Sequence, residues 1–190
     1  MRGTLALILL FIVTPAHAHD VFGLNAGPFW LGALHVLVAP LCIVAIIALA
    51  AAIPFSSGET VIGSAITAGA TAFVTALWAP AALAAAGPIG IVVAGLSAAF
   101  GFQPNLAFGV FLGAVAGFGA GAAAQLDLRV VSASLGVAVA IVSLLLWSVE
   151  AFVYTQRLLP LARRVVGAWT AAIALLLGAL AVRILFTPHR

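Results

Sequence analysis

The feature that most constrains the fold is a succession of long apolar segments with almost no charge inside them. Six of them follow one another, at residues 28–54, 61–82, 87–101, 105–124, 130–154 and 161–186. A helix needs about 20 mostly apolar residues to cross the hydrocarbon core of a bilayer, and every segment except the third reaches that length. The pattern predicts an all-α, polytopic transmembrane bundle of about six helices in a single domain.

Composition excludes a water-soluble fold. Hydrophobic residues make up 66% of the chain and charged residues 6%, whereas about a quarter of a soluble domain is charged. The net charge of +3 comes from scattered arginines, without the basic stripe or aromatic–basic alternation that binds nucleic acid. We therefore expect the lipid bilayer to surround this chain, and we expect no nucleic-acid partner.

The first 18 residues have the pattern of a cleavable secretory signal peptide. Arg2 supplies a positive start, residues 5–13 form a short apolar core, and Ala-His-Ala at residues 16–18 is a small-x-small cleavage site. Cleavage would leave a mature domain of residues 19–190. The alternative is an uncleaved anchor helix.

Arginines between the fifth and sixth segments predict the orientation. Arg157, Arg163 and Arg164 cluster there, and short loops rich in arginine face the cytoplasm. Counting back from that loop places the mature N-terminus outside, on the side to which a cleaved signal peptide delivers it. The sequence therefore predicts a multi-pass protein of the bacterial inner membrane with a periplasmic N-terminus.

The fourth segment carries glycine at every fourth position, at Gly109, Gly113, Gly117 and Gly121. Residues four apart lie nearly on one face of a helix, and a face of small residues lets another helix approach closely in a membrane. We expect this stripe to form the tightest helix contact of the bundle, which a bulky residue at Gly117 should disrupt. A flexible gating helix is the alternative.

The second segment carries threonine with the same spacing, at Thr67, Thr71 and Thr75. Their hydroxyl groups can bond to a carbonyl one turn earlier or to a neighbouring helix. One interpretation is polar adhesion between helices, and the other is a polar lining for a path through the bundle.

Two residues of the first segment are candidate metal ligands. His35 lies inside the apolar segment, where an ionisable side chain suggests function, and imidazole suits nickel, cobalt, copper and zinc. Cys42 follows seven residues later on nearly the same face, about 10.5 Å further along a regular helix. Both could reach one ion only if a kink at Pro40 shortens that gap. The alternatives are a hydrogen-bonded interior histidine and a small apolar packing cysteine.

Three further ionisable residues are weaker candidates. Glu150 lies near the cytoplasmic end of the fifth segment, where it could line a path and couple protons, or reach the interface and pair with Arg157. His19 and Asp20, at the mature N-terminus, form a candidate weak cation site. Because motifs such as Gly-x-Ser-x-Gly, His-Glu-x-x-His and the P-loop are missing from the sequence, we expect no enzyme activity and no bound cofactor.

The layout of the chain resembles a known family of membrane proteins. The sequence Ala-His-Ala-His-Asp at residues 16–20 is followed by six short apolar segments and by Arg-Arg-Val-Val-Gly-Ala at residues 163–168. This arrangement resembles the HupE/UreJ family of hydrogenase and urease accessory proteins, which are nickel and cobalt permeases. The resemblance covers nearly the whole chain and implies a six-helix bundle that carries a nickel or cobalt ion for metalloenzyme maturation.

The ligand motifs of that family are only partly present. Its first helix reads His-Pro-x-x-Gly-x-Asp-His-x-x-Ala-Met; His35 and Ala45 match, but Leu41 and Cys42 replace the aspartate and the second histidine. Its motif Phe-His-Gly-x-Ala-His-Gly corresponds to residues 115–121, where both histidines are alanine. The scaffold is therefore better preserved than the metal ligands.

Three functions remain open from the sequence. The first is a nickel or cobalt permease with a reduced ligand set. The second is a non-transporting membrane accessory that binds a membrane protein partner or a second copy of itself. The third is a transporter of a small uncharged solute, which a bundle with few polar groups would tolerate better than a bare cation.

Overall fold

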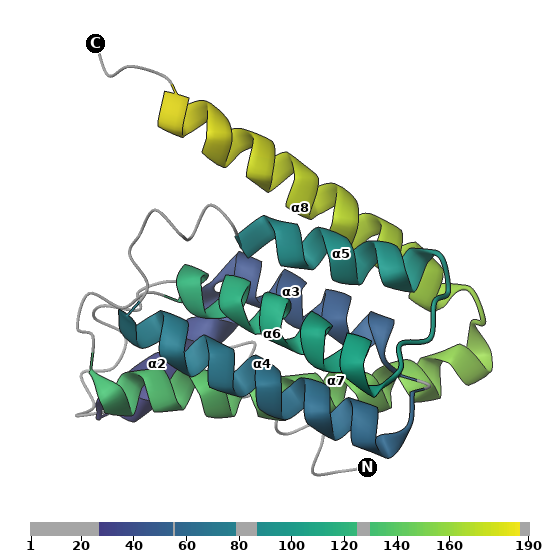
Figure 1. Cartoon of the computed structure of the whole chain (residues 1–190), viewed down its shortest axis with the longest axis horizontal. Helices are drawn as coiled ribbons and strands as arrows, with labels where there is room; N and C mark the ends of the chain where they lie inside the picture. Colours follow the sequence, from purple (N-terminus) through teal and green to yellow (C-terminus); the bar gives the residue numbers. More distant parts are fainter. Residues whose placement is uncertain (1–26, 55, 79–86, 125–129, 187–190) are drawn as a thin grey trace.

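The computed structural model describes residues 27–54, 56–78, 87–124 and 130–186, with side chains described as far as residue 180. These residues form seven helices and no strand (Figure 1): α2 (Pro28–Val38), α3 (Pro40–Ala52), α4 (Gly58–Trp78), α5 (Gly87–Ala99), α6 (Leu106–Ala123), α7 (Val131–Leu158) and α8 (Ala162–Phe186). The all-α prediction is confirmed for this part of the chain. The predicted signal peptide, His19 and Asp20 lie outside it.

Several of these helices have the length and composition of membrane spans. The helices α4, α6, α7 and α8 are each long and apolar enough to cross a bilayer, and the broken pair α2–α3 makes a fifth span if it is counted as one. The helix α5 has 13 residues, which corresponds to about 20 Å and is shorter than a hydrocarbon core of about 30 Å. The structure therefore contains four or five membrane-length spans together with one short apolar helix.

The first apolar segment is broken at Ala39, and its two halves are bent by 73°. Ala39 has an extended backbone, with φ −85° and ψ 107°, and Pro40 begins the next helix. A proline disfavours the helical conformation of the residue before it and has no N–H to continue the ladder. The kink predicted at Pro40 is thus present as a break one residue earlier.

The helix α3 is the centre of the bundle. It packs against α5, α6, α7 and α8, and its residues from Ala48 to Ala52 are buried, as is Ile53 directly after them. In Figure 1, α8 and α5 lie on one side of it and α4 and α7 on the other. The helix α2 lies against α7.

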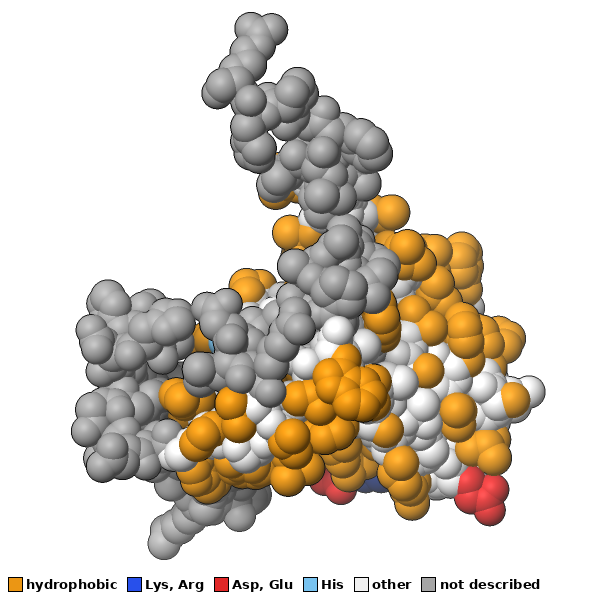
Figure 2. Space-filling view, turned by 60° about the vertical axis from the view of Figure 1, so that its left-hand side comes forward, with side chains coloured by type: hydrophobic (Ala, Val, Ile, Leu, Met, Phe, Trp, Pro, Cys, Tyr) orange, Lys and Arg blue, Asp and Glu red, His pale blue; other side chains and the backbone are white. Residues whose placement is uncertain are grey.

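The connections α3–α4, α5–α6 and α7–α8 meet at one end of the bundle, which we call the arginine end. Ser56 Oγ in the first connection donates to the carbonyl of Pro104 in the second at 3.2 Å, and the Arg163 guanidinium after the third donates to the carbonyls of Ala52 and Phe102. Consecutive helices from α3 to α8 therefore alternate in direction. Figure 2 shows charged atoms along one edge of a face that is otherwise mostly apolar.

Candidate functional site

The glycine stripe of α6 lies against α4, and the two helices run parallel. A methyl carbon placed on Gly117 would lie 2.6 Å from Ala68 Cα, and one placed on Gly113 would lie 2.9 Å from Ser64 Cα. Ordinary contacts of such a carbon begin at 3.4 Å, so only glycine permits this separation of the two backbones. The two helices form a seam without room for a path between them.

Threonine and serine hydroxyls line the α4 side of this seam, and each donates to a carbonyl one turn earlier in its own helix. The donor–acceptor distances are 2.7 Å for Ser64 to Thr60, 2.7 Å for Thr67 to Gly63, 2.8 Å for Thr71 to Thr67 and 2.8 Å for Thr75 to Thr71. The glycine stripe packs directly on three of these side chains, Ser64, Thr71 and Thr75. The hydroxyl protons are thus donated to carbonyls of α4 itself. This geometry fits close packing of two helices and not the lining of a polar path.

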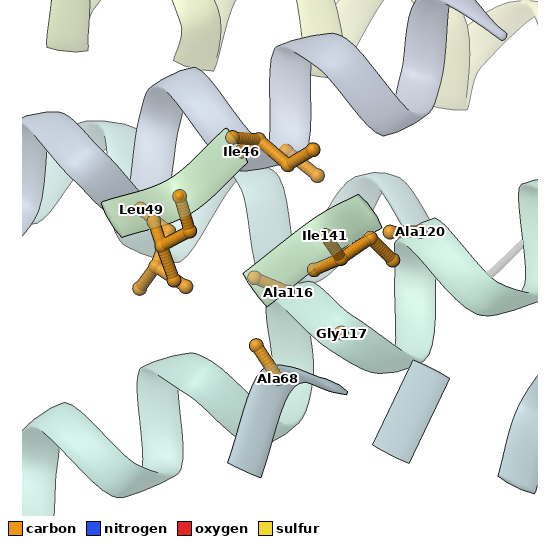
Figure 3. A pocket seen from close by; sticks show the side chains of 9 residues that line it. Ile46, Leu49, Ala68, Ala116, Gly117, Ala120 and Ile141 are labelled. Carbon is orange, nitrogen blue, oxygen red and sulfur yellow. The ribbon is translucent and has the colours of Figure 1, made fainter. Parts of the chain in front are cut away.

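A small apolar cavity lies where α3, α4, α6 and α7 meet (Figure 3). Its volume is about 10 Å³, and alanine, isoleucine, leucine and glycine alone line it, among them Ile46, Leu49 and Ile141. A water needs at least about 10–15 Å³ and two or more polar partners. This cavity has neither the volume nor the lining for a hydrated ion.

Cys42 and His35 lie on opposite sides of the break between α2 and α3. The Cys42 thiol is fully buried and donates to the carbonyl of Ala120 in α6 at 3.2 Å. His35 is half-buried on α2, the helix that packs on α7 through Gly32 and Gly136. The cysteine is thus bound to α6, whereas the histidine lies on α2, a helix that packs mainly on α7. Within the described ranges no three residues of His, Cys, Asp or Glu come together as a metal site.

Glu150 lies on the surface of α7 and is exposed. Thr75, by contrast, is buried against the glycine stripe of α6. The structure therefore does not bring Glu150 together with the seam that the threonines line. Within the described residues Glu150 forms no ion pair with Arg157.

Arg163 is a buried cation that the sequence reasoning assigned only to a cytoplasmic loop. Its side chain is 6% exposed. One guanidinium nitrogen donates to the carbonyl of Ala52, at the end of α3, and to that of Phe102, after α5. Its Nε has no hydrogen-bond partner. The side chain joins three helices at the arginine end, and positive charge at the carbonyl end of α3 is favourable for the helix dipole.

A signal for this burial was present in the spacing of small residues along α8. Gly167, Ala171 and Ala174 are all buried, and they follow Arg163 by four, eight and eleven residues. These positions lie on one face of a helix, the face that packs on Gly95 and Ala98 of α5. The small-residue face thus extends to Arg163.

No protein-family model, curated protein or solved structure matches this chain.

Proposed function

We propose that this chain is an inner-membrane permease for nickel or cobalt ions, of the HupE/UreJ type, that supplies metalloenzyme maturation. The resemblance over nearly the whole chain supports the family. The proposal includes six spans after a cleaved signal peptide, a periplasmic mature N-terminus and a cytoplasmic arginine end.

The observation that carries the proposal is the break in the first span, with a candidate ligand on each side of it. His35 lies four residues before Ala39, and Cys42 lies three residues after it. Broken spans are the places where transporters hold ions, because unwound carbonyls and the ends of half-helices can replace the water shell. An imidazole and a thiolate are ligands that nickel and cobalt accept.

The proposed transport requires α3 to move relative to α6. The Cys42 thiol donates to Ala120, and a thiol must lose its proton before it can bind a metal. A cycle that separates Cys42 from Ala120 would free the sulfur and open the apolar cavity beside it. The closed seams would then belong to a resting conformation.

A second candidate function is a non-transporting membrane accessory. The observation that favours it is the sealed packing of α4 on α6 together with the apolar character of the neighbouring cavity. A bundle that only presents its outer surface to a membrane partner needs no polar path. It would tolerate the loss of the histidines that the family motif contains.

Uptake by proteoliposomes separates the two functions. We would measure the entry of Ni²⁺ and Co²⁺ with an enclosed fluorescent chelator, for the unchanged chain, for His35→Ala and for Thr155→Ala as a control at the far end of α7. The permease proposal predicts saturable entry, at least a tenfold loss in His35→Ala and no change in Thr155→Ala. Entry equal to that of empty liposomes, for folded protein and both ions, would reject transport. Co-purification after cross-linking in membranes would then test the accessory function.

The proposed orientation has its own test. Gln103 is exposed in the α5–α6 connection, and the native Cys42 is buried. A membrane-impermeant maleimide should label Gln103→Cys in inside-out vesicles but not in intact spheroplasts. The opposite labelling would reverse the orientation.

A further inference from the structure

Two adjacent arginines at the beginning of α8 converge on one turn of the α5–α6 connection. Arg163 donates to the carbonyl of Phe102. The Arg164 guanidinium lies over Gly101, where a methyl carbon would be 3.1 Å from one of its terminal nitrogens. Gly101 has a φ of +71° and closes α5, with Phe102 N–H donating to the Ser97 carbonyl at 2.9 Å. Two positive charges therefore lie on the same small turn.

Among the described residues no carboxylate pairs with these two arginines, although Glu59 in the first turn of α4 lies at the same end of the bundle. Neither arginine forms an ion pair there, and the first turn of α8 contains no acidic residue. A helix N-terminus carries partial positive charge of its own and favours anions. The Arg163 side chain is only 6% exposed, and its Nε has no hydrogen-bond partner. The two arginines thus form a local cluster of positive charge without an ion pair, and one of them has an unsatisfied donor.

Exposed apolar side chains surround the two arginines. Phe100 is 80% exposed and Phe102 is 51% exposed. The α7–α8 connection adds three leucines, Leu158, Leu159 and Leu161, each more than 60% exposed. Aromatic and apolar side chains next to arginines at the ends of spans are typical of the membrane interface. A ligand with an anionic head and apolar chains would match both parts of this surface.

We propose that the arginine end binds the phosphate group of an anionic phospholipid through Arg164, with Arg163 as the positioning residue behind it. The exposed Arg164 guanidinium contacts the phosphate, and the acyl chains lie along Phe100 and Phe102. Arg163 holds the turn through the Phe102 carbonyl and adds to the local positive potential. The site depends on neither metal transport nor a protein partner.

The test compares lipid binding by the full chain and two variants. Arg164→Gln removes the proposed contact without changing the buried arginine, and Arg157→Gln is the matched control because Arg157 is an exposed arginine in the last turn of α7. Native mass spectrometry of protein titrated with phosphatidylglycerol or phosphatidylcholine gives the apparent affinity. One arginine near a bilayer surface changes the affinity for anionic lipid about fivefold.

The expected result is a preference for phosphatidylglycerol over phosphatidylcholine that falls about fivefold in Arg164→Gln and is retained in Arg157→Gln. Equal loss in both variants would show general attraction of the basic end and would overturn the site. No preference in the unchanged protein would overturn it as well. Inorganic phosphate should not displace the lipid at millimolar concentration, and displacement would show that a soluble phosphate is the ligand instead of a lipid.

Discussion

Replacing Gly117 by alanine tests whether the α4–α6 seam holds the bundle together. The added carbon would lie 2.6 Å from Ala68 Cα, whereas ordinary contacts begin at 3.4 Å. The Ala68 carbonyl oxygen would be closer still, at 2.2 Å, so the two backbones must separate by about 1.2 Å at this point. Backbone atoms cannot rotate away as the end of a side chain can, so both helices have to shift.

The cost of that shift follows from overpacking. Inserting one methyl group into a close-packed interior costs about 1–3 kcal/mol, and alanine recovers about 0.5–1 kcal/mol of helix propensity over glycine. We expect Gly117→Ala to lower the free energy of unfolding by about 1–2 kcal/mol. Gly178→Ala is the matched control in α8, because its added carbon would lie 3.5 Å from Pro88 Cβ. That variant should be neutral or slightly more stable.

Reversible unfolding in mixed dodecyl sulfate micelles gives both free energies, followed by the fluorescence of the four tryptophans. The reasoning predicts that the transition of Gly117→Ala moves to a lower mole fraction of denaturant and that the transition of Gly178→Ala does not. Equal stability of the two variants would refute it, because the close backbone approach would then contribute nothing measurable.

Three further predictions concern polar groups in the bundle. Thr71→Val should change the free energy of unfolding by less than about 1 kcal/mol, because interhelical and intrahelical hydroxyl bonds in membranes are weak; a larger loss in the same denaturation assay would give the hydroxyl a role beyond packing. Arg163→Ala should lower that free energy by about 3 kcal/mol, because it leaves two buried carbonyls without their charged donor, and a loss below about 1 kcal/mol would contradict the stabilising role of its bonds to Ala52 and Phe102. The buried Cys42 should react with N-ethylmaleimide at least a hundredfold more slowly in detergent than after unfolding, and fast labelling of the folded protein would contradict its bond to Ala120.

The helices could be predicted from the sequence because a membrane span consists of a continuous run of apolar residues. The six predicted segments coincide with helices α2–α3 to α8, and Pro40 locates the break in the first. Such a run forms a helix wherever lipid surrounds it, because its backbone groups must then bond within the segment. No knowledge of the other segments is needed to predict it. The number of helices that cross the membrane could not be predicted in the same way. The helix α5 is apolar, but its 13 residues are too few to classify it as a span by length.

The partners of the packing faces could not be predicted. The spacing of Gly109 to Gly121 indicates a close contact but does not say with which helix, and the structure places it against α4, two helices earlier in the chain. That choice depends on the arrangement of the whole bundle. Arg163 was interpreted as a sign of orientation, because the charge of a residue near a span end does not reveal whether its side chain turns inward over the bundle.

The short helix α5 has a consequence for how the chain is made. Its glycines contact α6 at Gly119 and Val115, and α8 at Gly167, so both of these partners are synthesised after it. A segment of 13 residues is too short for insertion on its own hydrophobicity, since a span needs about 20. α5 therefore depends on two later helices, α6 and α8, and its final surroundings are complete only when α8 has been synthesised. Truncation before α8 should consequently expose α5 to quality-control proteases even though every residue of α5 is present.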